Sequence, residues 1–315
     1  MAPRGRWAAS VVIVASLAIG ALPARSHPIP QARRCRPFPA TSHWNQPVNK
    51  LPLVSNSAAM IRSIGADDGL VADFGSGTRN EAPIGMPVVV VPRDQEEVPV
   101  RIDPYADESD RGPYPIPPGA PTESGAHQTG DRHLIIVQRG SCKLHELDEA
   151  HEMDGGRLWR AESAARWDMD SNRLRPRGWR SADGAGLPIF PGLVRWHEIV
   201  HGSIDHALRL TVPMTRAAYI YPARNALTEE TNPDVPAMGE RVRLKSSFDL
   251  SGFPREVRLI LAALKRHGAF VADHGPVWSL SGSPDENWDD AALARLGEVK
   301  GRDLEIVDTS RLPRP

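Results

Sequence analysis

The chain of 315 residues lacks several features that mark common protein classes. Its two cysteines are too few for a disulfide-dense small domain or a cysteine-rich zinc module. A formal net charge of -1 offers no basic surface for general nucleic-acid binding. The sequence contains no glycine-rich phosphate loop, and no Gly-x-Ser-x-Gly motif nominates a serine nucleophile. Nucleotide-binding folds and serine hydrolases are therefore not indicated.

The first residues have the pattern of a secretory signal peptide. Arg4 and Arg6 form a basic start, an uncharged apolar run follows from Trp7 to Leu22, and small residues precede position 27. The alternative is a transmembrane anchor, but the run is shorter than the roughly 20 residues that a spanning helix needs. We therefore predict a signal peptide over residues 1–26, export to the periplasm or medium, and no membrane span in the mature protein.

Export would place the two cysteines where a disulfide can form. In an oxidising compartment, Cys35 and Cys142 are most simply joined as one disulfide. The alternative is two unrelated thiols.

The mature sequence predicts a mainly β fold. Thirty prolines oppose a helical bundle, and six of them make residues 27–56 a Pro-rich extended arm. Strand patterns recur, for example over 134–139 and 142–147, where Gly140 and Ser141 predict a hairpin. A helix with apolar residues at helical spacing is predicted between Pro254 and Gly268. We expect one β-sandwich or jelly-roll-like domain over 57–315, with a few peripheral helices.

The sharpest motif is His197-Glu198-Ile199-Val200-His201, which reads His-Glu-x-x-His. On a helix, His197 and His201 could both bind zinc, and Glu198 would act as base on a zinc-bound water. The context is poor, because Gly202 ends any helix early and no third ligand has the usual spacing. We therefore expect no cofactor, and keep zinc as the alternative.

A second polar set accompanies two predicted strand starts. Asp131, Arg132 and His133 open one strand, while Asp205 and His206 open another that carries Arg209. If the two starts are neighbours, these groups meet at one rim of the sheet, where carboxylates can do acid–base chemistry. We predict Glu198, Asp205, His206 and His133 as catalytic, and Asp131, Arg132 and Arg209 as substrate-binding. Strand alternation also places His206 on the core face, so a buried structural role stays open.

Tryptophan is unusually frequent, with eight residues against six phenylalanines and four tyrosines. Exposed indole rings on a β scaffold can stack on sugars. Trp44, Trp196 and Trp288 are the candidates; Trp44 and Trp288 have polar neighbours, which favours exposure. The alternative is that these rings fill the core.

The chain resembles a family of exported proteins from soil bacteria whose activity is unknown. The resemblance spans most of the mature chain and rests on residues 130–133, 192–195, 202–208, 221–223 and 238–241, including the Asp-Arg-His and Ile-Asp-His-Ala-Leu motifs. It brings no activity with it. Since the family pattern has Glu198 but no histidine at 197 and 201, the resemblance implies that the zinc motif is accidental.

Three functions stay open. The leading prediction is a secreted glycan-active protein, a polysaccharide hydrolase or lyase that uses carboxylates and acts on a polysaccharide or cell-wall glycan. The alternative is a non-catalytic protein that binds carbohydrate or belongs to the envelope. The third is a zinc metallopeptidase.

Overall fold

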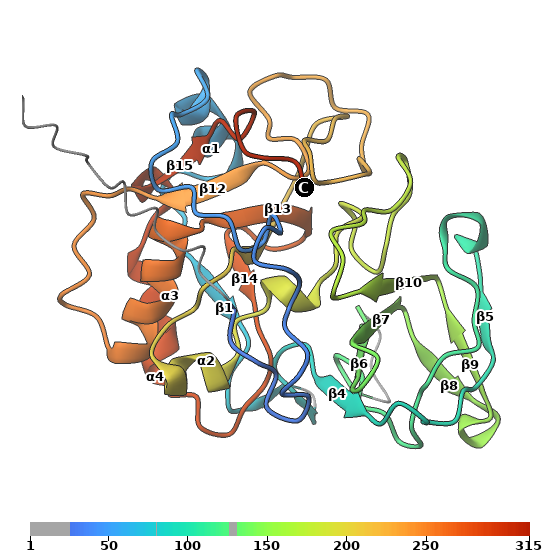
Figure 1. Cartoon of the computed structure of the whole chain (residues 1–315). Helices are drawn as coiled ribbons and strands as arrows, with labels where there is room; N and C mark the ends of the chain where they lie inside the picture. Colours follow the sequence, from blue (N-terminus) through green and yellow to red (C-terminus); the bar gives the residue numbers. More distant parts are fainter. Residues whose placement is uncertain (1–25, 80, 126–130) are drawn as a thin grey trace, which may run out of the picture.

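A computed structural model describes residues 26–79, 81–125 and 131–315, so the predicted signal peptide lies outside it except for Ser26. Its largest element is a six-stranded sheet, on the left in Figure 1, in the order β1-β14-β11-β13-β12-β15. The strands are β1 (Val71–Asp73), β11 (Leu208–Val212), β12 (Arg241–Leu244), β13 (Ala269–His274), β14 (Ser279–Ser281) and β15 (Leu304–Val307). The pairs β1–β14 and β11–β13 are parallel, and the other three pairs of this sheet are antiparallel.

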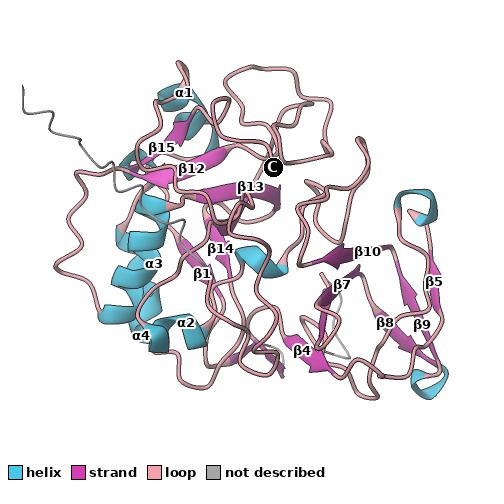
Figure 2. Ribbon diagram, viewed as in Figure 1, coloured by secondary structure: helices cyan, strands magenta, loops and turns pink. Residues whose placement is uncertain are grey.

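Three smaller sheets make up the rest. A four-stranded sheet in the order β10-β7-β6-β4 lies beside a three-stranded sheet in the order β5-β9-β8. Their strands are β4 (Val88–Val91), β5 (Val100–Ile102), β6 (Leu134–Gln138), β7 (Lys143–Asp148), β8 (His151–Met153), β9 (Leu158–Ala161) and β10 (Ser163–Asp168). A short pair, β2 (Thr78–Arg79) and β3 (Ala82–Pro83), completes the set. Long loops connect the sheets (Figure 2).

The helices are few and short. They are α1 (Ser57–Ile64), α2 (Trp196–His201), α3 (Arg255–Arg266) and α4 (Asp290–Ala294), with 3-10 turns at Ala106–Glu108, Asp154–Gly156, Phe190–Gly192, Arg295–Glu298 and Gly301–Asp303. Helix α3 buries Val257, Ile260, Leu261 and Leu264, which recur at helical spacing and form one apolar stripe. Gly268, with φ of +67°, adopts the left-handed conformation that lets the chain turn from α3 into β13.

Two sides of the molecule have their own cores. One cluster joins α1, α3 and the six-stranded sheet, and includes Trp278, Phe270 and Leu208. Two others lie on opposite faces of the four-stranded sheet, because successive β6 residues alternate between them: Ile135 and Val137 face one, Leu134 and Ile136 the other. The functional side chains described below come from both sides.

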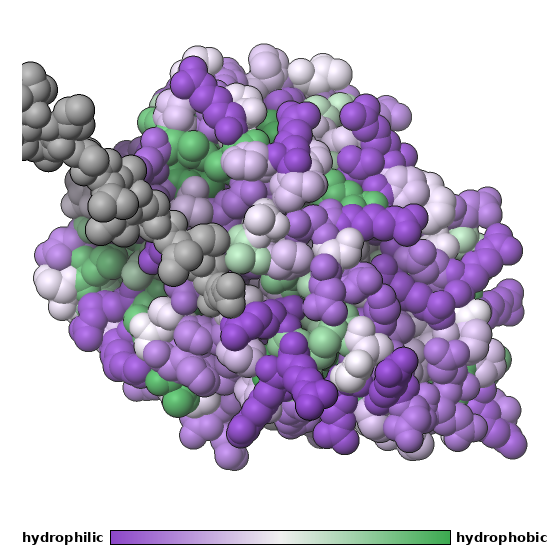
Figure 3. Space-filling view, viewed as in Figure 1, coloured by the Kyte–Doolittle hydropathy of each residue, from purple (hydrophilic) through white to green (hydrophobic). Residues whose placement is uncertain are grey.

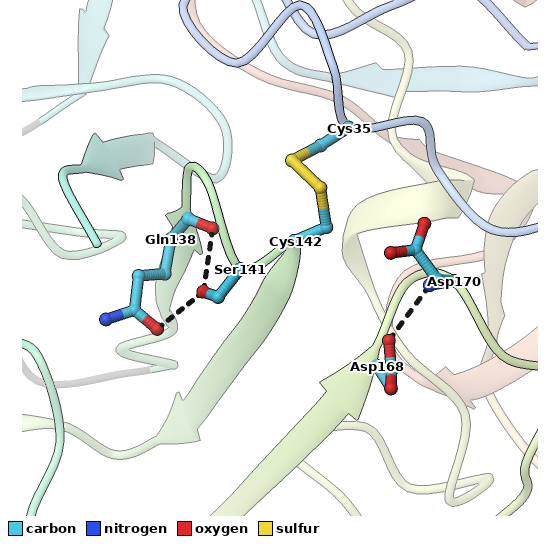
Figure 4. The surroundings of a disulfide bond; sticks show 6 residues. All are labelled: Cys35, Gln138, Ser141, Cys142, Asp168 and Asp170. Carbon is cyan, nitrogen blue, oxygen red and sulfur yellow. Dashed lines mark hydrogen bonds between the residues drawn. A yellow bond between two sulfur atoms is a disulfide. The ribbon is translucent and has the colours of Figure 1, made fainter.

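The segment 27–56 contains no helix or strand, as its prolines predict. It is packed against the molecule, with Cys35 and Val48 fully buried. Cys35 and Cys142 form a disulfide across 107 residues, which confirms the predicted pairing (Figure 4). Further along, Trp44 accepts a backbone hydrogen bond from Ala207 N at 2.6 Å. The arm therefore connects β7 to the start of β11.

The prediction of a mainly β protein with several sheets and few helices is confirmed: strands hold 25% of the residues and helices 17%. The hairpin is present as β6 and β7. The parallel pairs, such as β11 with β13, were not indicated by the sequence. Around Ala218 and Ile220 the structure has only an isolated bridge between Tyr219 and Met238.

The surface in Figure 3 is mostly hydrophilic, with hydrophobic residues in scattered patches. Among the described helices, none is both long and apolar enough to cross a membrane.

Candidate active site

The residues expected to share one rim of a sheet lie in two separate places. Asp131, Arg132 and His133 precede β6, and the side chains around His133 also surround Arg209 of β11. Glu198 of α2 and His206, which precedes β11, pair with each other elsewhere. The set around His133 and Arg209 is called the open group, and the set around Glu198 and His206 is called the closed group.

The closed group is Arg195, Glu198 and His206, with side chains 5%, 0% and 0% exposed. Glu198 Oε1 accepts a hydrogen bond from Arg195 Nη2 at 2.6 Å and lies 2.9 Å from His206 Nε2. His206 Nδ1 donates to the Ala207 carbonyl at 2.8 Å. Neither side chain is accessible to solvent, so the structure gives no support to the predicted catalytic roles of Glu198 and His206.

The short helix α2 explains why Glu198 points inward. Glu198 is its third residue, and its Oε2 accepts from the Arg195 backbone N–H at 3.3 Å, which closes a capping box. Burial would raise the pKa of Glu198, but the charges of Arg195 and His206 outweigh it and hold the pKa well below its usual range. Glu198 is therefore ionised at neutral pH and pairs with Arg195 and His206.

Asp205 does not join Glu198. Its carboxylate accepts from Ser203 Oγ at 2.9 Å and lies 3.6 Å from His27 Nε2. The two carboxylates predicted as catalytic therefore have different partners, with Glu198 bonded to Arg195 and His206.

The His-Glu-x-x-His motif lies on α2, which has only six residues. His201 Nδ1 lies 2.6 Å from the His197 carbonyl of its own helix, and the two rings are 6.2 Å apart. Glu198, the base that this motif would use, is buried in the closed group. In the part of the chain that the structure describes, no group of three or more His, Cys, Asp or Glu could hold a metal ion.

Of the three tryptophans expected to stack on sugars, Trp44 and Trp288 are core residues, and Trp196 is partly buried against the same core. Trp44 and Trp288 are each only 3% exposed, so the prediction of their exposure is wrong. Trp44 packs edge-on against Phe270 at 4.8 Å, and Trp288 against Phe74 at 5.0 Å and Trp196 at 4.9 Å. Polar neighbours in sequence did not prevent burial, because Trp288 Nε1 donates to the Ser283 carbonyl.

The open group lies where the two large sheets approach each other. It contains one histidine, one arginine and five carboxylates: Asp73, Glu123, His133, Asp148, Asp183, Arg209 and Asp273. The β6–β7 register pairs Leu134 with Leu147, so His133 and Asp148 are neighbours at one end of the hairpin. Arg209 and Asp273 come from the adjacent parallel strands β11 and β13.

His133 holds two carboxylates together. Its Nδ1 lies 2.5 Å from Glu123 Oε2, while Nε2 lies 3.0 Å from the Ala182 carbonyl and 3.6 Å from Asp148 Oδ1. Burial opposes protonation of the ring, but the charges of Glu123 and Asp148 outweigh it and raise the pKa of His133 to about 10. The ring is therefore an imidazolium at neutral pH and donates from both nitrogens.

Arg209 organises the other half. Its Nη2 donates to Asp183 Oδ1 at 3.0 Å and to Asp273 Oδ2 at 3.2 Å, and Nη1 donates to Ser281 Oγ at 2.8 Å. Asp273 also accepts from the backbone N–H groups of Gly184 and His274. Three donors thus hold the Asp273 carboxylate in place, and its side chain is still 23% exposed.

Asp148 is the member with the clearest proton-transfer character. Burial, together with the charges of Asp131 and Asp273, raises its pKa from 3.8 to about 6, although His133 acts in the other direction. Its side chain is 27% exposed. Burial and the charge of Glu123 also raise the pKa of Asp73. A carboxyl that retains its proton in mild acid therefore lies near an Arg-bound carboxylate.

Arg132 holds a loop in place through its guanidinium group. It is 4% exposed, and its guanidinium donates to the carbonyls of Ala150 and Gly125 and to Thr122 Oγ1. These bonds hold the loop that carries Glu123. Asp131 is exposed, as a substrate-binding role requires.

Of the open group, the sequence analysis named only His133 and Arg209. The hairpin register could have nominated Asp148, since it lies opposite His133. Glu123, Asp183 and Asp273 carry no local signal, because they meet only through tertiary contacts. No family model, curated protein or solved structure matches the chain.

Proposed function

We propose that the protein is an exported hydrolase of glycans and that the open group is its active site. The observation that carries the proposal is the contrast between Asp148, whose pKa is raised to about 6, and Asp273, whose carboxylate is held by Arg209. A carboxyl group with a raised pKa beside a carboxylate that is held by an arginine is an arrangement suited to acid–base cleavage of a glycosidic bond.

The roles follow from the environments. Asp148 donates its proton to the leaving glycosidic oxygen as the bond from that oxygen to the anomeric carbon breaks. Asp273 takes a proton from the water that adds to the anomeric carbon. His133 and Arg209 hold Asp148 and Asp273 in place from beneath, and the exposed Asp131 accepts hydrogen bonds from sugar hydroxyls.

Hydrolysis fits the open group better than elimination by a lyase. A lyase needs a neutral base to remove a proton from the sugar ring. Since the pKa of His133 is raised to about 10, its ring carries no free lone pair at neutral pH. Export is supported by the disulfide, which persists in oxidising compartments.

The test is a screen of plant, fungal and bacterial polysaccharides for release of reducing ends. We expect Asp148→Asn and Asp273→Asn each to lower turnover by about 100-fold or more, while their Tm stays near that of the unaltered protein. Glu96→Gln, an exposed acid outside the open group, is the matched control and should have no effect.

Two outcomes would contradict the proposal. Turnover that survives both substitutions would remove the open group from catalysis. Binding of a polysaccharide without any cleavage would favour the alternative of a non-catalytic carbohydrate-binding protein.

A further inference from the structure

A second polar site lies away from the open group, at the opposite end of strand β7. It is a groove of about 630 Å³ between the β6–β7–β10 sheet and the loop that follows β10. Lys143 and His145 of β7 and Arg166 of β10 line it, together with Arg173 and Arg175 of the loop. This volume lies in the range of small-molecule pockets and exceeds what a single inorganic anion fills.

The groove contains cations that no carboxylate neutralises. Arg175 pairs with Asp110 at 2.5 Å and Lys143 with Asp168 at 2.7 Å. Within the described residues, Arg166 and Arg173 have no such ion pair. Arg166 instead lies over the Tyr114 ring, 4.4 Å from its centroid, and donates to the Pro113 carbonyl. Two guanidinium groups at this groove therefore have donors to offer a ligand.

His145 is the unusual residue of the groove. Its side chain is 5% exposed, yet neither ring nitrogen has a hydrogen-bond partner in the described structure. Burial and the charges of Arg166 and Lys143 lower its pKa to about 4, so the ring is neutral at pH 7. A neutral imidazole offers one donor and one acceptor, and leaving both unpaired in a buried position is costly.

Acidic residues also line the groove. Glu97 is exposed and Asp110 half-buried, and both supply acceptor oxygens beside the cationic groups. Donors for an anionic group next to acceptors for hydroxyl groups are complementary to a charged sugar. A bare oxyanion would leave most of the groove empty.

We propose that this groove binds an anionic saccharide of about two sugar units. Its carboxylate or sulfate group accepts from Arg166 and Arg173, and His145 hydrogen-bonds to the ligand between them. Hydroxyl groups of the sugar donate to Asp110 and Glu97. The proposal goes beyond the proposed hydrolysis and does not depend on it, because binding is measured without turnover.

The test is calorimetric titration of the full mature protein with four probes: digalacturonate, a monosulfated galactobiose, neutral galactobiose and inorganic sulfate. We expect the two charged disaccharides to bind at least ~10-fold more tightly than galactobiose and sulfate, the difference made by charged hydrogen bonds. The two charged probes distinguish a uronate from a sulfated sugar.

Substitutions of residues that line the groove test whether the ligand binds there. Arg166→Gln, Arg173→Gln and His145→Phe should each weaken the charged disaccharide by roughly 5- to 10-fold. His145→Phe keeps an aromatic ring. Weaker binding by this variant would therefore result from the loss of the ring nitrogens and not from a loss of side-chain volume. Arg157→Gln is the matched control, since Arg157 is an exposed arginine on the β8–β9 side, paired with Asp154.

Three results would overturn the proposal: equal affinity for galactobiose, sulfate binding as tightly as the charged disaccharides, or affinities unchanged in all three groove variants. Asp148→Asn should bind the charged disaccharide normally. Loss of cleavage with binding retained, or the reverse, therefore separates the failure of this proposal from that of the hydrolase.

Discussion

The closed and open groups are built from similar residues but differ in access to solvent. Both combine arginine, histidine and carboxylate side chains. In the closed group Arg195, Glu198 and His206 are all at most 5% exposed. In the open group His133 and Arg209 are as deeply buried, but Asp148 and Asp273 are about a quarter exposed. Ion-pair chemistry in the sequence therefore does not distinguish a structural group from a candidate active site; solvent access does.

The largest expected effect concerns the closed group. Glu198→Ala leaves Arg195 and His206 buried without their carboxylate, which typically costs about 3–5 kcal/mol. We expect the free energy of unfolding, from urea titration followed by tryptophan fluorescence, to fall by that amount. At pH 4, where Asp148 keeps its proton in the folded state, Asp148→Asn in the open group should change it by less than about 1 kcal/mol. Equal losses of stability in both variants would contradict the distinction drawn between the closed group and the open group.

The disulfide links the elements that carry the two groups. Cys142, bonded to Cys35 (Figure 4), lies just before β7, which ends at Asp148. Cys35 belongs to the arm that reaches Ala207 beside His206. The Cys35→Ser, Cys142→Ser double variant should lose about 2–5 kcal/mol of stability, because a 107-residue loop is no longer closed in the unfolded chain.

The measurement is the urea midpoint of the double variant against that of the oxidised protein. The unaltered protein, measured at low and at high concentration of reductant, provides the control for effects of the substitutions themselves. An unchanged midpoint would mean that the arm is held by packing alone.

Local sequence patterns predicted the elements but not the open group. The β6–β7 hairpin and α3 are visible because period-2 and helical apolar patterns, with Gly140 and Gly268, are properties of neighbouring residues. Asp183 and Asp273 meet Arg209 only after two sheets have assembled. The exposure expected for Trp288 failed for the same reason, since its burial depends on Phe74 and Trp196, which are distant in sequence.

The two groups should respond to pH with opposite signs. The folded state keeps the Asp148 proton up to pH about 6, whereas an unfolded aspartate loses it near 3.8. The contribution of Asp148 to stability therefore falls as pH rises from about 4 to about 6. Glu198, whose folded pKa is lowered, contributes stability above its unfolded value of 4.5 and loses it on acidification.

The contributions of Asp148 and Glu198 are measured by comparing the stability of each variant with that of the unaltered protein at several pH values. The stability of Asp148→Asn relative to the unaltered protein should rise between pH 4 and 6.5 by on the order of 2 kcal/mol. The relative stability of Glu198→Gln should instead be lowest near neutral pH and recover toward pH 3. A flat difference for Asp148→Asn, or a Glu198 difference of the same sign, would contradict the assignment. Titration of the Asp148 carboxyl by NMR gives the pKa directly.

The smallest effect is expected outside both groups, at the zinc motif. His201 is exposed, and its only polar contact among the described residues is with the His197 carbonyl. His201→Ala should therefore shift Tm by no more than about 1–2 °C, as surface substitutions generally do. Glycan cleavage should be equal before and after dialysis against EDTA. A chelator-sensitive activity that His201→Ala also abolishes would transfer the active site from the open group to α2, because a catalytic metal makes its ligand indispensable whatever that ligand adds to stability.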